Sequence, residues 1–379
     1  MDFHLGEEEK MIQEMVRDFV EKEVKPVAEK LDETGEFPYE IMKKLGELGL
    51  LGTVIPEEYG GSGASFLSYI VAIEELSRGC ASTGVIVETH TSLAVEPILA
   101  WGTEEQKRKY LPKLATGEII GSFGLTEPNA GSDAGGMQTT AVLDGDAYVI
   151  NGSKMFISNA GVAGITILLT KTDKNLGYKG MTEFIVERDT PGYSVSAPIH
   201  KLGIKASQTC ELSFDNMRVP KESVLGKPGQ GFKIAMHTLD GGRIAIAAQA
   251  LGIAQAAFEE SVAYAKQRCQ FGQPIGKFQG VQWMIADMAT DIQAARLLVY
   301  HAAWLKDQRL PYSKEAAMAK LYASEAAMRH TVKAVQVHGG YGYTMEYPVQ
   351  RHMRDAKITE IYEGTSEVQR MVIANHVLK

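Results

Sequence analysis

Cysteine is scarce in this sequence, and its three cysteines lie far apart. Cys80, Cys210 and Cys269 form no Cys-x-x-Cys pair among the 379 residues. Such spacing argues against a disulfide framework and against a zinc site, and it fits a reducing cytoplasm. We therefore expect a soluble, cytoplasmic protein without a bound metal.

The sequence also lacks an excess of positive charge and a long apolar run. Its formal net charge of −8 argues against a broad nucleic-acid-binding surface. The most apolar run, residues 244–258, is interrupted by Gln249 and Gln255 and is too short and too polar to span a bilayer. The acidic start, residues 1–10, has no apolar segment typical of a secretory signal. We expect residues 244–258 to form a buried core helix and the protein to bind neither nucleic acid nor a membrane.

Three segments of different composition follow one another along the chain. Apolar residues at helical spacing, among them Met11, Met15 and Phe19, indicate helices at the start. β-branched residues, glycine and turn signals then indicate strands, and residues 226–231 (GKPGQG) are typical of a linker before helical spacing returns. The predicted fold is α+β with several domains: an N-terminal helical domain of residues 1–120, a middle β domain of residues 121–230 and a C-terminal helical domain of residues 231–379.

Local signals place some element ends. Thr103 and Gln106 have the spacing of a helix capping box. The Asp144-Gly145 pair precedes the alternating residues 147–150, a pattern typical of a β-hairpin. Further strands are predicted at residues 165–172, 182–188 and 210–219.

The first candidate functional segment is FGLTEPNAGSD, residues 123–133. It carries Thr126, Ser132 and many backbone N–H groups on a glycine-containing loop, which can approach a flat ring or a phosphate closely. A plain surface turn rich in Asn, Gly, Ser and Asp explains the segment about equally well.

The second segment is KMFISNA, residues 154–160. Phe156 and Ser158 alternate on a predicted strand, so they are expected to share one face. An aromatic surface beside a hydroxyl suits a flavin ring, although a core aromatic next to a strand-end serine is the simpler interpretation of this segment alone.

The third segment is RCQFGQPIGKFQ, residues 268–279. Arg268 follows a long predicted helix and precedes a Gly/Pro turn, where a fixed guanidinium could hold a pyrophosphate in a bidentate manner. An arginine that caps the carbonyls at a helix C-terminus is the common alternative.

The fourth segment is QVHGGYGY, residues 336–343. Two glycines within a helical stretch cost about 1 kcal/mol each relative to alanine, so a close approach by a backbone or a ligand should compensate. Termination of the helix at Gly339 is the simpler interpretation of this segment alone.

The fifth segment is RDAKITEIYEGTSEVQR, residues 354–370. Ser366 and Gln369 have capping-box spacing and predict a helix start at 366. Glu363 then lies on a short turn next to Gly364, where a carboxylate can point into a cavity. An acid that only complements the helix dipole is about equally compatible with this segment.

Together these five segments resemble the acyl-CoA dehydrogenase family. The resemblance covers essentially the whole chain, from PEEYGG (56–61) to IYEGT (361–365), and is closest to the bacterial short-chain, or butyryl-CoA, dehydrogenases. Several long motifs in the same order are far more specific than any one of them. The resemblance implies an N-terminal helical domain, a middle β-barrel or sandwich domain and a C-terminal four-helix bundle.

The resemblance also implies a flavoenzyme of fatty-acid β-oxidation in the cytoplasm of a bacterium. Such an enzyme converts a short-chain acyl-CoA thioester to the trans-2-enoyl-CoA, with N5 of FAD accepting the β-hydride. It passes the electrons to electron-transfer flavoprotein. It is expected to be a homotetramer, a dimer of dimers, in which FAD is shared across a subunit interface.

Site residues are carried over by the same matching. Glu363 corresponds to the base that takes the α-proton, while its backbone N–H and the flavin ribityl chain polarise the thioester carbonyl. A water-poor cleft would raise its pKa toward the working pH. The implied FAD contacts are Phe123, Leu125, Thr126, Ser132, Phe156, Ser158, Arg268, Phe271, Gln279, Gln336, Gly339, Gly340, Thr365 and Glu367. The implied substrate contacts are Ser132, Asp240, Arg243, Tyr362 and Gly364.

The sequence departs from many relatives at three of these positions. Phe156 and Ser158 stand where Trp and Thr are common, and Glu367 stands where Gln is common. An aromatic surface and a hydroxyl are kept, so the roles of Phe156 and Ser158 are expected to persist. In some relatives the base lies just before the arginine of LDGGR (239–243); here that position is Gly242, which supports Glu363 as the base.

Glu88, in VIVETHTSL (85–93), does not fit the pattern of the short-chain relatives. The segment matches the helix that lines the acyl pocket, where these relatives usually have a small residue. The Glu88 carboxylate could face a partner helix or solvent, narrow the pocket, or act as a second acid for an unusual acyl group such as a cyclic one.

Several other functions share much of this pattern. An enoyl-CoA reductase that runs the reaction in reverse with electron-transfer flavoprotein would have the same site, and so would a dehydrogenase of branched or cyclic acyl-CoA. An acyl-CoA oxidase, reoxidised by O₂, is a further alternative, but acyl-CoA oxidases are usually much longer than this chain, which counts against it. A non-catalytic acyl-CoA-binding scaffold would be expected to lose the base or the flavin contacts, and neither is lost.

Overall fold

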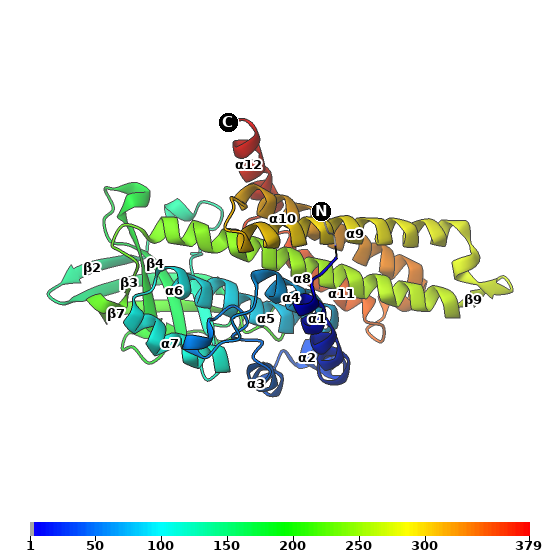
Figure 1. Cartoon of the computed structure of the whole chain (residues 1–379), viewed down its shortest axis with the longest axis horizontal. Helices are drawn as coiled ribbons and strands as arrows, with labels where there is room; N and C mark the ends of the chain where they lie inside the picture. The colour runs from blue at the N-terminus through cyan, green and yellow to red at the C-terminus, as the bar shows by residue number, and fades with distance from the viewer. Residues whose placement is uncertain (1–3) are drawn as a thin grey trace.

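The computed structural model describes residues 4–379 and confirms the predicted succession of helices, strands and helices (Figure 1). The N-terminal helices are α1 (Glu7–Phe19), α2 (Ala28–Thr34), α3 (Tyr39–Glu47), α4 (Phe66–Gly79), α5 (Ala81–His90), α6 (Glu96–Trp101) and α7 (Glu104–Thr116). The middle strands are β1 (Gly121–Gly124), β2 (Thr140–Asp144), β3 (Ala147–Ile157), β4 (Ile165–Lys171), β5 (Met181–Glu187), β6 (Tyr193–Val195), β7 (Cys210–Pro220) and β8 (Val224–Leu225). The last part contains α8 (Gly231–Gln267), β9 (Cys269–Gln270), β10 (Gln273–Pro274), α9 (Gln279–Asp307), α10 (Ser313–His338), α11 (Val349–Thr359) and α12 (Ser366–Val377).

The N-terminal helices follow the local signals in part. The capping box at α7 is confirmed, because the Thr103 side chain accepts from the Gln106 backbone while the Gln106 side chain accepts from the Thr103 backbone. On α1 the apolar pattern is only partly a core face. Phe19 is buried, but Met11 and Met15 are exposed, at 70% and 37%.

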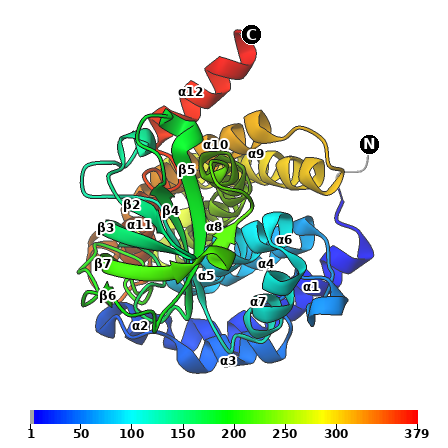
Figure 2. The same cartoon turned by 90° about the vertical axis from the view of Figure 1, so that its left-hand side faces the viewer.

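The middle segment folds into one mostly antiparallel sheet, in which β2 and β4 pair in parallel. The strand order is β6-β7-β3-β2-β4-β5-β8, and β1 pairs in parallel with β4. The predicted hairpin is confirmed, since Asp144 pairs with Ala147 across a turn in which Gly145 has a φ of +65°. Figure 2 shows this sheet on the side that faces the viewer, with α4 to α7 beside it and α2 and α3 below it.

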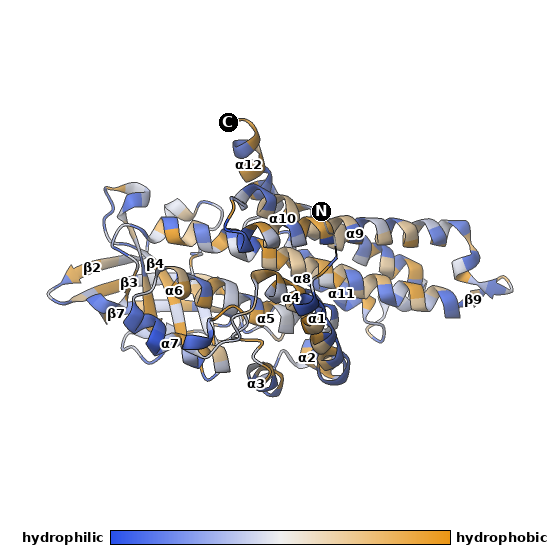
Figure 3. Cartoon of the chain, viewed as in Figure 1, coloured by the Kyte–Doolittle hydropathy of each residue, from blue (hydrophilic) through white to orange (hydrophobic). Residues whose placement is uncertain are grey.

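Helix α8 is the central element of the fold. It runs from the sheet to the hairpin of β9 and β10 at the far end of the molecule (Figure 1). The apolar run 244–258 lies within it and is largely buried, as predicted. It packs against α4, α5, α9, α10 and α11. Figure 3 shows hydrophobic residues along the central helices and hydrophilic ones at the β9 end.

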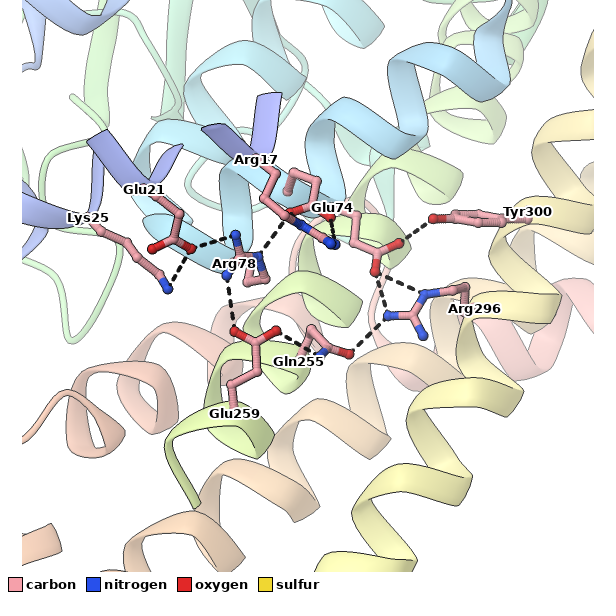
Figure 4. A network of polar contacts seen from close by, with 10 residues as sticks. Arg17, Glu21, Lys25, Glu74, Arg78, Gln255, Glu259, Arg296 and Tyr300 are labelled. Atoms are coloured by element: carbon pink, nitrogen blue, oxygen red, sulfur yellow. Dashed lines mark hydrogen bonds and ion pairs between the residues drawn. The ribbon is translucent and has the colours of Figure 1, made fainter. Parts of the chain in front are cut away.

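Buried charges tie the N-terminal helices to the C-terminal ones (Figure 4). On α4, Arg78 donates to Glu259 of α8 at 3.0 Å. Glu74, one turn earlier, accepts from Arg296 at 3.0 Å and from Tyr300 at 2.7 Å, both on α9. Glu74 and Arg78 are buried, so the loss of a partner would leave an uncompensated charge inside the protein. These contacts therefore fix α4, and with it the following helix α5, against α8.

Two expectations from composition can be compared with the structure. Cys80 and Cys210 are buried and Cys269 is exposed, and none of the three forms a disulfide. Between residues 4 and 379, no helix combines the length and the apolar character that a membrane span requires.

One carboxyl of the sheet is buried without a partner. Glu183 on β5 is fully buried on the face that also carries Met181 and Ile185, and neither of its carboxyl oxygens has a hydrogen bond among the described residues. Burial therefore raises the pKa of Glu183 well above its usual range. Burial therefore favours the neutral side chain in the folded protein, whereas the same group ionises readily in the unfolded chain.

The expected consequence is a stability penalty that grows with pH. Above the ordinary glutamate pKa of about 4.3 the unfolded state loses this proton and the folded state keeps it, which costs up to about 1.4 kcal/mol per pH unit. We expect Glu183→Gln to raise the melting temperature more at pH 8 than at pH 5, as measured by thermal unfolding. Glu47→Gln, at an exposed position, serves as the control. Equal effects of Glu183→Gln at both pH values would contradict this account.

Candidate active site

The turn between α11 and α12 holds Glu363 in a backbone conformation that few side chains adopt. The φ of Glu363 is +53° and that of Gly364 is +96°, so two successive residues lie in the left-handed region. Such a conformation costs roughly 1–2 kcal/mol for a non-glycine residue. Lys320 Nζ and Gln369 Nε2 both donate to the Gly364 carbonyl, at 2.7 Å and 2.8 Å. These two bonds hold the turn in place.

The helix start at 366 is confirmed, but its cap differs from the prediction. The side chain of Thr365 accepts from the Val368 backbone at 3.3 Å, while the Ser366 hydroxyl is buried without a partner. Gln369 is not available to complete a capping box because its side chain binds the Gly364 carbonyl. Glu367 is exposed on the first turn of α12, which projects from the body of the molecule (Figure 2).

The Glu363 side chain points at Gly242 on α8. A Cβ atom at position 242 would overlap with Glu363 Oε2 and would lie 3.1 Å from Leu93 Cδ2. Glycine at 242 therefore does more than leave the alternative base position empty: it provides the space that the Glu363 carboxyl occupies.

Burial is the main influence on the Glu363 carboxyl. The residue is partly exposed as a whole, but its Oε2 atom is buried and has no hydrogen-bond partner among residues 4–379. Desolvation raises the pKa of Glu363 to about 7, although the neighbouring Glu88 carboxyl and the charges of Lys320 and Arg243 oppose this rise. A carboxyl of that pKa can both take up and release a proton at neutral pH.

Lys320 is a site residue that the sequence analysis missed. It is fully buried on α10, and burial lowers the pKa of its ammonium to about 7 while the Glu363 charge raises it. Lys320 is the one charged residue in the alanine-rich stretch 316–324 (AAMAKLYAS). A lone lysine inside an apolar helix face was the signal that could have identified it.

Glu88 does not face solvent. It is fully buried on α5, and its neighbours are Thr89, whose hydroxyl donates to Glu88 Oε2 at 3.3 Å, and the Glu363 carboxyl. Burial, together with the negative charge of Glu363, raises the pKa of Glu88 well above its usual range. The interpretation of Glu88 as a solvent-facing residue is therefore wrong, because α5 is enclosed by α4 and α8.

Of the predicted substrate residues, Tyr362 and Gly364 belong to this turn and Arg243 is near it, whereas Ser132 is on the loop 123–133. Arg243 is buried on α8 and donates to Asp240 at 2.5 Å, one turn away. Asp240 lines a cavity of about 410 Å³ together with His237 and Tyr312. Tyr362 donates a hydrogen bond from its hydroxyl to Gln249 Oε1, which ties the turn to the middle of α8.

A buried ion pair holds the loop 123–133 in place. Lys154 Nζ donates to the Leu125 carbonyl at 3.0 Å and to Glu127 Oε1 at 2.9 Å. Phe123 is buried, whereas Leu125 and Thr126 are partly exposed. Ser132 is exposed on the same loop. The loop therefore presents backbone and hydroxyl groups outward from a fixed base.

The expectation that Phe156 and Ser158 alternate on a regular strand is wrong. β3 has an irregular register between Lys154 and Ile157, and Phe156 has a φ of +59°. Ser158 lies beyond the end of the strand and is partly buried. The bulge turns the Phe156 ring outward, where it is 60% exposed. An exposed aromatic ring in a constrained backbone suits a flat ligand.

Six further predicted cofactor residues lie near the end of α8 that carries β9. Arg268 and the backbone of Gly339 and Gly340 line a cavity of about 480 Å³, in which the Arg268 guanidinium lies 5.4 Å from the centre of the Tyr341 ring. α10 ends at His338, so the helix terminates at Gly339, whose φ is +60°. Phe271, Gln279 and Gln336 are exposed near this end, and Phe271 is 94% exposed. The structure thus divides the predicted cofactor residues into two separate groups within one chain.

The space at Gly242 gives a direct structural prediction. We expect Gly242→Ala to displace the Glu363 carboxyl, because the added Cβ would occupy its position. Crystal structures of the variant and the parent would measure the displacement. Gly241→Ala is the matched control, since its Cβ would meet the end of the Lys306 side chain, at 3.0 Å, and not Glu363. An unmoved Glu363 side chain in Gly242→Ala would show that the site has more room than we infer.

Family models match nearly the whole chain. The model of the acyl-CoA dehydrogenase N-terminal domain matches residues 6–118, and that of the middle domain matches residues 122–217. The model of the acyl-CoA dehydrogenase C-terminal domain matches residues 229–378.

Individual proteins agree with these matches over their full lengths. The short-chain specific acyl-CoA dehydrogenase of Clostridium acetobutylicum is 57% identical over 100% of both chains. Butyryl-CoA dehydrogenase from Megasphaera elsdenii has a structure that matches with a TM-score of 0.98 at 50% identity, over 100% of both chains. A chain in a structure of the electron transferring flavoprotein of Acidaminococcus fermentans matches with a TM-score of 0.99 at 52% identity, also over 100% of both. The chain described here therefore belongs to the acyl-CoA dehydrogenase family.

Proposed function

We propose that this protein is an FAD-dependent dehydrogenase of short-chain acyl-CoA thioesters, in which Glu363 removes the α-proton. The observation that carries the proposal is the Glu363 carboxyl, buried against Gly242 with a pKa of about 7. The full-length likeness to a short-chain specific dehydrogenase and to a butyryl-CoA dehydrogenase supports the substrate class.

The groups on the turn suit the removal of a proton next to a thioester. Among the described residues, Glu363 Oε2 accepts from no backbone N–H or hydroxyl group, and a carboxylate has several lone pairs with which to accept a proton from a substrate carbon. The Glu363 backbone N–H makes no hydrogen bond within residues 4–379 and can donate to the thioester oxygen. A donor at that oxygen stabilises the negative charge that develops as the α-proton leaves. Base and donor thus come from one residue on one rigid turn.

The residues present fit FAD, which supplies the hydride acceptor when it is bound. The exposed ring of Phe156 and the braced loop 123–133 offer a surface for a flat ring system. Arg268, above the open backbone of Gly339 and Gly340, suits a pyrophosphate in a protein whose net charge is negative. A guanidinium fork binds such a group in a bidentate manner.

The separation between the Arg268 site and the surface formed by Phe156 and the loop 123–133 supports a homo-oligomer. Within one chain, Arg268 lies at the β9 end of α8, whereas Phe156 belongs to β3 of the sheet from which α8 starts (Figure 1). A second copy could supply the missing end, which is compatible with a homotetramer built as a dimer of dimers. We further propose that the protein works in the cytoplasm and passes electrons to electron-transfer flavoprotein, as its likeness to a chain from a structure of such a flavoprotein suggests.

Replacement of the base tests the proposal. We expect Glu363→Gln to retain FAD and acyl-CoA binding but to slow flavin bleaching by butyryl-CoA roughly 10³-fold or more, because the amide cannot accept the α-proton. Anaerobic stopped-flow absorbance measures the rate.

Glu360→Gln is the matched control, since Glu360 is near the same turn but pairs with Lys357 at 2.7 Å. A near-normal rate in Glu363→Gln would remove Glu363 from the mechanism. A wild-type protein that is not bleached by any acyl-CoA would refute the proposed reaction.

A further inference from the structure

Two carboxyl groups share one buried space beside Gly242. Glu88 comes from α5 and Glu363 from the turn before α12, far away in sequence. Oε1 of Glu88 and Oε2 of Glu363 are both buried, and neither has a hydrogen-bond partner among the described residues. The two side chains are nevertheless within hydrogen-bonding reach of each other. A proton between them would satisfy both carboxyl groups.

The charge balance of this space requires such a proton. Two carboxylates in contact would repel each other, and burial would deprive both of solvation. The two nearest cations bind other groups, since Arg243 pairs with Asp240 and Lys320 donates to the Gly364 carbonyl. One negative charge can be tolerated here, because Lys320 on α10 and Arg243 on α8 oppose the rise in the pKa of Glu363.

The surroundings decide which carboxyl is ionised. Glu363 faces the two cations, Lys320 and Arg243. The groups around Glu88 that can titrate are the neutral hydroxyls of Tyr69 and Tyr362, together with Glu363 itself. The two cations therefore favour the anion on Glu363 and the proton on Glu88.

We propose that Glu88 is a positioning residue whose neutral carboxyl donates a hydrogen bond to the Glu363 carboxylate and keeps that base ionised in a dry site. The pairing follows from the two buried carboxyls alone, whereas its effect on catalysis depends on the proposed function. Glu88 contributes neither a proton nor a bond to the product. It stabilises the form of Glu363 that can accept the α-proton.

This arrangement makes the base a pair with two macroscopic pKa values rather than a single group. The pair gives up its first proton at the lower of these pKa values. This pKa sets the acid limb in the pH profile of flavin reduction. Loss of the Glu88 donor leaves Glu363 with burial as the dominant influence, so its pKa should rise. An amide at position 88 can still donate, so it should largely preserve the pKa of Glu363.

The first test is the pH profile of flavin reduction in the holoenzyme with butyryl-CoA. We expect Glu88→Met, which keeps the volume but has no donor, to move the acid limb up by about one pH unit, a tenfold change in the proton concentration. Glu88→Gln should stay within a few tenths of a unit of wild type. Glu183→Gln, which changes a buried carboxyl remote from the turn, is the matched control and should not shift the limb.

An acid limb in Glu88→Met that coincides with wild type would overturn the proposal. A purely structural role for Glu88 would lower the rate at all pH values without moving the limb, and this result would also count against the proposal.

The second test does not depend on activity or on the folding of the Met variant. In the oxidised, substrate-free holoenzyme, the infrared difference between wild type and Glu88→Gln should contain the C=O stretching band of a protonated carboxyl. The corresponding difference for Glu183→Gln identifies the band of the other neutral glutamate. Absence of a protonated-carboxyl band in the Glu88 difference would overturn the pairing. If wild type fails to bleach with acyl-CoA while the band is present, the proposed function fails and the pairing stands.

Discussion

The Glu363 carboxyl is placed where water cannot solvate it fully, and much of the surrounding structure compensates for that cost. A buried carboxylate without a partner is expensive enough that it normally takes up a proton instead. Here Gly242 provides the space, and the ammonium of Lys320 provides a nearby positive charge without a direct ion pair. The pKa of Glu363 near neutrality is the balance between desolvation and these influences.

This balance depends on elements that are distant in sequence. The turn is held from α10 by Lys320 and from α12 by Gln369, while α8 supplies Gly242 and Arg243. The ion pairs of Figure 4 fix α4, and therefore α5 with Glu88, against the same face of α8. Each of these elements would be an ordinary packed helix by itself. Their packing around one left-handed turn makes the carboxyl both buried and chargeable.

The sequence predicted those features that depend on local physics. The helical and β segments, the capping box at Thr103 and the hairpin at Gly145 were predictable because each rests on a few neighbouring residues. The turn at Glu363 was predictable from the residues that precede α12. The bulge at Phe156 was not, because a positive φ at a non-glycine residue leaves no mark on hydrophobic periodicity.

Contacts between elements that are distant in sequence could not be predicted from the sequence either. Glu88 was noticed as unusual, but its contact with Glu363 depends on how α5 packs against α8, and Lys320 was overlooked for the same reason. The five segments gave the candidate cofactor residues without showing that Arg268 lies at the β9 end of α8, apart from the sheet that carries Phe156.

The central claim is that the buried Glu363 carboxylate takes the α-proton as the flavin is reduced. The most direct measurement is the anaerobic rate of flavin reduction by butyryl-CoA deuterated at the α-carbon, compared with the protiated compound from about pH 5 to about pH 9. The account predicts that deuterium slows the reduction and that the rate falls as the pH drops through about 7, where Glu363 gains a proton. A rate that is insensitive to α-deuterium and independent of pH would contradict the account.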